Sequence, residues 1–352
     1  MAEERILLLT KDMSDYRGAS YQQDVIDALS AQADVQKYGP GYPGFENSDN
    51  LEDILAKSPV RPDFILLGHS WLPDVQTNSF LLPNCDFRTS NIPVVAILNK
   101  EYVNLERKVE YLRENRCRLI FSHHHGIKSI VPSNQLNSVF WPFAYNEKKI
   151  CTNSSCRNID LGFSGILLNQ LSGAKQTSSR LDTMREIFFC WGDLPIKKKR
   201  KYREFNIFWN GMPRIKERNA LLLGKRIQKL FFPKYGYRHL PEERYFELLS
   251  RSKLLLNSLS PMGLIGPRFF EAMASGAVVI AERNPNYENL FPEGLVMQFD
   301  QTLSDFSHFL TEMLRNEEKR QEISGRGREL VCKHHQWRHR VDTLLDLVRK
   351  LK

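Results

Sequence analysis

Short apolar runs rich in Val, Ile, Leu and Phe recur about every 25 to 30 residues along the chain, and segments of helical period lie between most of them. A strand, a helix and another strand in succession are typical of βαβ units, which build parallel sheets. In the first half of the chain the pattern predicts six strands, at residues 5–10, 35–38, 63–68, 92–98, 118–121 and 138–141. Helical faces are formed by Tyr21, Val25, Ile26 and Leu29, and by Leu105, Val109 and Leu112.

A second series of the same kind follows. It predicts strands at 160–165, 206–209, 253–257, 277–282 and 295–299, and helices at 180–190 and 267–275. The first of these strands is expected to lead into a glycine turn at Gly165, and the second to end at Asn210 and Gly211. The remaining C-terminal stretch is expected to be helical.

Two successive series predict an α/β fold with two Rossmann-like, doubly wound parallel-sheet domains that face each other. We expect the first domain to occupy residues 1–150 and the second 151–335. Ligands of such sheets bind beyond the carboxyl ends of the strands, so a ligand is expected in the cleft between the domains.

The apolar runs also limit where the protein can reside. They are far shorter than the ~18 residues that span a bilayer, and no basic, apolar leader pattern opens the chain. We therefore expect a cytoplasmic protein, and its six cysteines are expected to be free thiols. No Cys-x2-Cys pair is present, so no metal site is expected.

Positive charge is concentrated in the second half of the chain. Residues 1–150 hold 16 Lys and Arg against 19 Asp and Glu, whereas residues 151–352 hold 34 against 22. Residues 197–229 alone carry 12 basic and 2 acidic side chains. This basic segment favours an anionic partner: a phosphorylated ligand, an anionic membrane face or nucleic acid. For the run at 197–201 the alternative is a solvated loop.

The predicted helix at 267–275 carries the clearest functional signal. Pro267 suits its first position and Gly276 the residue after its end. The N–H groups of its first turn, approached closely beside Gly266, form an anion site to which Arg268 adds a bidentate phosphate partner. Glu271 lies one turn on and can accept hydrogen bonds from hydroxyl groups. The alternative is that Arg268 and Glu271 simply pair with each other along the helix.

The string Arg268-x-Phe270-Glu271-Ala272-x-Ala274-x-Gly276 and the preceding residues 245–257 resemble the nucleotide-sugar half of GT-B glycosyltransferases. Within the glycosyltransferase 1/4 superfamily, the chain is most similar to the CgeB-like, spore-maturation-protein-like branch. The resemblance implies a nucleoside-diphosphate-sugar donor, a role in glycan biosynthesis, no cofactor and no obligatory metal. It also implies that Glu271 holds the ribose hydroxyls, that Arg268 and Gly266 face the diphosphate, and that a closing helix, 336–352, packs on the first domain.

The chain departs from the common pattern of that superfamily at one position. Many retaining members carry a glutamate eight residues before the ribose glutamate, and here that position is Gly263. The chain also lacks Asp-x-Asp, so basic groups are expected to neutralise the leaving diphosphate. The further candidates for nucleotide-sugar binding are Gly165, Arg180, Arg218 and Lys225.

Two histidines are the candidate catalytic residues. His69 follows the strand predicted at 63–68 and His123 follows the one at 118–121. Side chains at strand ends reach the functional edge of such sheets, and histidine takes up a proton near neutral pH. Each histidine could instead be a structural residue. Nearby aromatic residues are candidates for stacking on an acceptor sugar or for core packing: Trp71, Phe80, Phe87 and Tyr102.

The sequence therefore favours a glycosyltransferase that acts on a glycan, a lipid-linked or another acceptor, with a possible peripheral contact to an anionic membrane. Two alternatives stay open. One is a protein that binds or modifies nucleic acid through residues 197–229, although a nucleic-acid partner is the less favoured one. The other is a catalytically silent nucleotide-sugar-binding relative, in view of Gly263.

Overall fold

The computed structural model describes residues 4–15, 20–71, 80–131, 136–151, 156–168, 207–214, 240–257, 259–299 and 306–351. The chain divides into two compact units. Unit 1 comprises Met1–Tyr145 and His335–Lys352, and unit 2 comprises Asn146–His334.

Unit 1 is built on a six-stranded parallel sheet with the order β2-β1-β3-β4-β5-β6. Its strands are β1 (Arg5–Leu9), β2 (Asp34–Tyr38), β3 (Phe64–Leu67), β4 (Val94–Ile97), β5 (Leu119–Ser122) and β6 (Ser138–Phe140). All six predicted strands are confirmed, with ends that differ by a few residues. The inner strands β3, β4 and β5 are buried along their whole length, which is why they read as continuous apolar runs and not as alternating ones.

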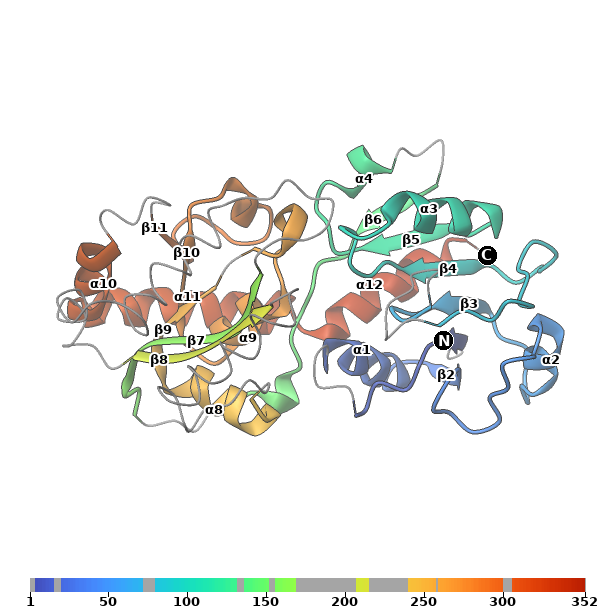
Figure 1. Ribbon diagram of the computed structural model, residues 1–352, viewed down its shortest axis with the longest axis horizontal. Coiled ribbons are helices and arrows are strands. Elements are labelled where there is room, and N and C mark those ends of the chain that lie inside the picture. The colour runs from blue at the N-terminus through green and yellow to red at the C-terminus, as the bar shows by residue number, and fades with distance from the viewer. Residues whose placement is uncertain are drawn as a thin grey trace, which may run out of the picture. The chain divides into compact units, whose positions relative to one another are not determined.

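Helices cover this sheet (Figure 1): α1 (Ser20–Ser30), α2 (Leu51–Ala56), α3 (Leu105–Glu114) and α4 (Ile127–Ile130). The apolar faces predicted for α1 and α3 are confirmed, because Val25, Ile26 and Leu29 are buried in the first and Leu112 in the second. The apolar pattern does not predict α2, which is only six residues long. A capping box between Asn50 and Asp53 starts this helix.

The last helix, α12 (Trp337–Arg349), returns to unit 1 and lies beside α1 (Figure 1). The indole of Trp141 donates to the carbonyl of Arg340, at 2.8 Å. The Arg340 guanidinium in turn donates to the carbonyls of Pro142 and Phe143. The helix is therefore held by both apolar burial and hydrogen bonds to the segment that follows β6.

Unit 2 contains a five-stranded parallel sheet with the order β11-β10-β9-β7-β8. Its strands are β7 (Ile159–Leu168), β8 (Ile207–Arg214), β9 (Ser252–Leu256), β10 (Val278–Glu282) and β11 (Val296–Phe299). The five strands predicted for the second half are present, but two of their ends were predicted wrongly. Gly165 and the pair Asn210-Gly211 lie inside strands, because β7 and β8 stay hydrogen-bonded to each other up to Leu168 and Arg214. No turn therefore follows at Gly165.

Among its described residues, unit 2 has the helices α8 (Glu242–Arg251), α9 (Pro267–Ala274), α10 (Phe306–Arg315) and α11 (Glu317–His334). Short 3₁₀ turns lie at Glu147–Lys149 (η2), Pro261–Gly263 (η4) and Pro285–Asn289 (η5). The helix predicted at 180–190 lies outside the described residues. Among the residues that are described, no helix is both long enough and apolar enough to cross a bilayer.

Candidate functional site

The strand order of each sheet contains a switch point, where successive connections run in opposite directions. In unit 2 this point lies between β7 and β9, and in unit 1 between β1 and β3. In open α/β sheets, ligands bind beyond the carboxyl ends of the strands at such points. The candidate residues of unit 2 lie at its switch point; in unit 1, His69 follows β3 at the switch point, whereas His123 follows β5, two strands along the sheet.

In unit 2, the N-terminus of α9 meets the switch point. Gly162 of β7 pairs with Leu255 of β9, so Ser164 and Asn257 lie level with each other where β9 ends. The Arg268 guanidinium donates to the Ser164 carbonyl at 2.5 Å, and the Asn257 amide donates to the Arg268 carbonyl at 3.2 Å. The first turn of α9 is thereby attached to both strands.

The helix limits read from the sequence are confirmed. Gly266 is the N-cap and Pro267, which has no N–H, follows it; no side chain caps this end, and the Phe269 N–H donates to the Gly266 carbonyl at 3.2 Å. At the other end Gly276 has φ 77°, and the Arg157 guanidinium lies so close that a Cβ would not fit without movement. Uncapped N–H groups at the positive end of a helix are suited to bind an anion.

Arg268 and Glu271 each contact another element of unit 2. While Arg268 reaches β7, a carboxylate oxygen of Glu271 accepts a hydrogen bond from the Tyr245 hydroxyl of α8, at 2.6 Å. Glu271 is 9% exposed, and the Tyr245 ring is half-buried beside it. Burial, followed by the neighbouring Glu271 carboxylate, raises the pKa of Tyr245 well above its usual value, so the phenol stays a donor. Nothing in the sequence alone predicts a role for Tyr245.

The loop before α9 explains why a glutamate does not fit at position 263. Gly263 has φ 77°, a left-handed conformation that non-glycine residues rarely adopt, and a Cβ there would collide with the Asn286 amide. Met262, the residue before it, also has a positive φ, of 61°. In contrast, Gly266 has an ordinary φ of −77°, and a Cβ there would meet only the Ser260 hydroxyl, at an ordinary contact distance of 3.9 Å. Its lack of a side chain leaves the helix N-terminus accessible.

Of the remaining candidates in unit 2, the structure describes only Gly165, which directly follows Ser164. Gly165 lies in β7. Arg180, Arg218 and Lys225 lie outside the described residues, as does most of the basic segment 197–229.

In unit 1 the two candidate histidines lie side by side. The Nε2 atoms of His69 and His123 are 3.0 Å apart, and the side chains are 4% and 3% exposed. His123 Nδ1 is 2.8 Å from the Trp141 carbonyl, which can only accept. Neutral His123 therefore carries its proton on Nδ1 and accepts at Nε2 from His69, which leaves Nδ1 of neutral His69 as the proton-accepting atom.

A buried carboxylate supports this pair. Glu101, which is 1% exposed, accepts from the His123 backbone N–H and from the Ser122 hydroxyl, both at 2.8 Å. Burial lowers the pKa of His69 well below 6.5, with a smaller contribution from His123. Burial is also the largest effect on His123, whose pKa is lowered even though Glu101 opposes the shift. Both rings are therefore neutral at pH 7.

This burial predicts a pH-dependent stability. The unfolded chain takes up protons near pH 6.5, whereas folded unit 1 does so only at lower pH. The free energy of unfolding should therefore keep its full value above pH 6.5. As the pH drops below 6.5, this free energy should decrease by up to about 1.4 kcal/mol per pH unit for each histidine. Denaturant titrations between about pH 8 and pH 5.5 measure this decrease. The free energy of unfolding should decrease less on acidification in His69→Gln than in the unchanged protein. His308→Gln, at an exposed position of α10, is the control. If the free energy of unfolding of His69→Gln depends on pH as steeply as that of the unchanged protein, the prediction is wrong.

Aromatic residues near the histidines have different surroundings. Trp71 and Phe87 belong to the hydrophobic core of unit 1, and Phe80 packs against that core. Trp71 and Phe80 meet edge to face with ring centres 5.0 Å apart. Core packing therefore accounts for these three side chains, which were candidates for stacking on a sugar.

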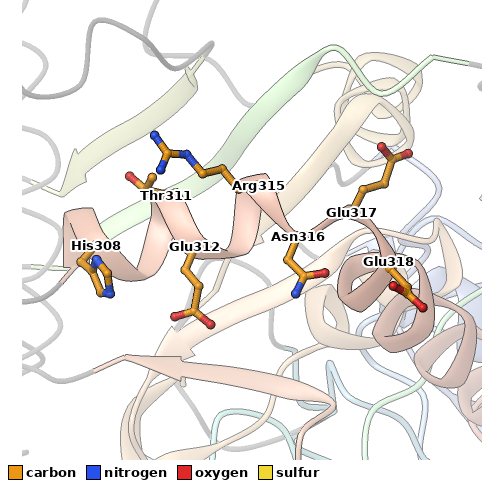
Figure 2. A pocket seen from close by; sticks show the side chains of 7 residues that line it. All are labelled: His308, Thr311, Glu312, Arg315, Asn316, Glu317 and Glu318. Carbon is orange, nitrogen blue, oxygen red and sulfur yellow. The ribbon is translucent and has the colours of Figure 1, made fainter.

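Figure 2 shows a hollow elsewhere on unit 2, lined by side chains of α10 and the start of α11, from His308 to Glu318. It contains none of the candidate residues. Within the part of the chain that the structure describes, no three or more His, Cys, Asp or Glu side chains are grouped to hold a metal ion.

Comparisons with known proteins bear on the class of protein and on its fold. A family described as glycosyl transferase-like matches residues 200–346, which include α8, β9 and α9. No curated protein matches the sequence. The match gives no support to the nucleic-acid alternative, and it does not separate the CgeB-like branch from its relatives.

Three solved structures illustrate the structural similarity. A glycosyltransferase from Rickettsia africae is 11% identical, with a TM-score of 0.62 and 99% of each chain covered. Sucrose-phosphate synthase from Thermosynechococcus elongatus is 11% identical, with a TM-score of 0.59 and 99% of each chain covered. Anabaena HepE, in complex with UDP and glucose, is 9% identical, with a TM-score of 0.57, 99% of this chain and 100% of HepE covered. These similarities confirm the α/β GT-B fold.

Proposed function

We propose that this protein is a glycosyltransferase that moves a sugar from a nucleoside-diphosphate sugar to a hydroxyl group of an acceptor such as a glycan or a lipid-linked sugar. The family match over residues 200–346 and the GT-B fold support the reaction class. The single observation that carries the donor site is the uncapped N-terminus of α9, with Arg268 and Glu271 beside it at the switch point of unit 2.

In this proposal the diphosphate binds at the first turn of α9. The positive end of the helix dipole favours an anion, and Arg268 supplies a cation that can turn from the Ser164 carbonyl to a phosphate oxygen. Glu271 accepts hydrogen bonds from the ribose hydroxyls. Since these groups neutralise the diphosphate themselves, the reaction is proposed to need no metal ion or other cofactor.

His69 is the proposed proton acceptor, and His123 is its positioning partner. The acceptor oxygen forms a bond to the sugar carbon, the bond from that carbon to the diphosphate oxygen breaks, and the hydroxyl proton passes to Nδ1 of His69. The proton on His69 Nε2 can then shift to His123, which lies beside the Glu101 carboxylate. Within the described residues no hydrogen-bond partner occupies Nδ1 of His69.

The direct test is calorimetry with UDP, GDP, ADP and dTDP in the presence of a chelator. We expect one of these nucleotides to bind without metal. UDP is the first choice, because the HepE complex contains it. Absence of binding under chelation, together with its recovery when Mg²⁺ or Mn²⁺ is added, would contradict the metal-free site.

A second assay separates a transferase from a catalytically silent relative. An active enzyme is expected to release nucleoside diphosphate slowly from its nucleotide sugar, because water can replace the acceptor. Binding of the nucleotide sugar with no release, even when candidate acceptors are added, would favour the silent relative.

A further inference from the structure

The Tyr245 hydroxyl offers a function that the family resemblance does not assign. Tyr245 lies in the first turn of α8, 26 residues before Glu271, and the two side chains meet through an O–H···O hydrogen bond of 2.6 Å. A hydrogen bond to a carboxylate at this distance belongs to the strong, charge-assisted class. It fixes one oxygen of Glu271 and so determines where the other oxygen lies.

We infer that Tyr245 is a positioning residue that orients Glu271 to recognise the 2′-hydroxyl of the donor, so that the protein selects ribonucleotides over 2′-deoxyribonucleotides. The inference rests on the proposed function, since it assumes that Glu271 faces the ribose. A carboxylate that is free to rotate loses conformational entropy when a ligand orders it, whereas one that is already held loses less.

Three features of the site favour a role in recognition over one in stability alone. Tyr245 and Glu271 lie on separate helices that both border the switch point, and the half-buried Tyr245 ring forms part of the surroundings of the carboxylate. The Arg268 charge is close enough to lower the pKa of Tyr245 in opposition to burial, so the cation belongs to the same cluster. The raised pKa of the phenol keeps it protonated, and its O–H can therefore donate to Glu271 throughout the working pH range.

The experiment compares UDP with 2′-deoxy-UDP by calorimetry, using the full chain. The unchanged protein is expected to prefer UDP by about tenfold, the effect of one hydrogen bond to a charged group. Tyr245→Phe removes only the hydroxyl and should weaken UDP binding by about three- to tenfold, while 2′-deoxy-UDP binding changes little. The preference for ribose should therefore largely disappear.

A double variant and a matched control complete the test. If the two residues act through their hydrogen bond, Tyr245→Phe combined with Glu271→Gln should bind UDP no worse than Glu271→Gln alone. Tyr111→Phe makes the same chemical change in unit 1, where the Tyr111 hydroxyl accepts from the Trp71 indole. This control should lower the melting temperature and leave the preference for ribose unchanged.

The outcomes distinguish this inference from the proposed function. If the unchanged protein binds none of the ribonucleotides tested, the proposed donor site itself is wrong. If it binds UDP and Tyr245→Phe keeps the same ratio of UDP to 2′-deoxy-UDP affinity, only the role of Tyr245 is overturned. Equal weakening of both nucleotides, with a lower melting temperature, would likewise show that the hydroxyl is merely structural.

Discussion

Removal of residues 336–352 is expected to unfold unit 1. This deletion removes α12, of which five apolar side chains are at most 3% exposed: Trp337, Val341, Leu344, Leu345 and Val348. Burying each such side chain stabilises a fold by roughly 1.5–3 kcal/mol, and the total is comparable with the roughly 5–15 kcal/mol that a whole domain possesses. The deletion also leaves the Trp141 indole without its acceptor, the Arg340 carbonyl.

Thermal melts followed by circular dichroism, together with limited proteolysis, measure this effect. The truncated chain should lose the cooperative transition of unit 1 and become cleavable within residues 1–145. Removal of residues 350–352 alone is the matched control, since it spares the buried face of α12 and should leave the melt almost unchanged. A truncated protein with the same transition as the full chain would refute the structural role of this helix.

Substitution of Arg268 by alanine is expected to weaken nucleoside-diphosphate binding by about one to two decades. A charge-assisted contact between a guanidinium and a phosphate contributes roughly 1.5–3 kcal/mol, and every 1.4 kcal/mol changes the dissociation constant about tenfold. Arg268→Lys keeps the charge but cannot form a bidentate contact. Its affinity for the nucleoside diphosphate should therefore lie between those of the alanine variant and the unchanged protein.

Two further variants make this measurement specific. Arg326→Ala removes the same charge from α11, where Arg326 pairs with Glu322 in an exposed position, and it should not alter nucleotide affinity. Glu271→Gln should weaken binding while the melting temperature hardly changes. If Arg268→Ala lowers stability and leaves affinity intact, the contact with the Ser164 carbonyl is its whole role. The main physical support for the donor site would then be lost.

Features that depend on neighbours in the sequence could be predicted without the structure. The buried strands β3, β4 and β5 appear as apolar runs because both faces of a parallel sheet are covered. The limits of α9 follow from Pro267 and Gly276, each of which favours a backbone conformation found at one end of a helix. The alternation of such elements was sufficient to predict the α/β fold.

Strand ends depended on pairing partners far away in the chain. Gly165 and Gly211 looked like turn residues, yet they pair with each other inside β7 and β8. A glycine is tolerated within a strand when its backbone groups are hydrogen-bonded to a neighbour, and local composition does not reveal that neighbour.

The sequence by itself determined which residues are candidates for binding and catalysis, and the tertiary structure decided which of these candidates meet. His69 and His123, 54 residues apart, become a hydrogen-bonded pair because β3 and β5 end at the same edge of one sheet. Arg268 and Glu271, which could have paired along α9, instead contact β7 and α8. Helical and strand periods record only which face of an element is buried, whereas the partner of a polar side chain depends on how separate elements pack.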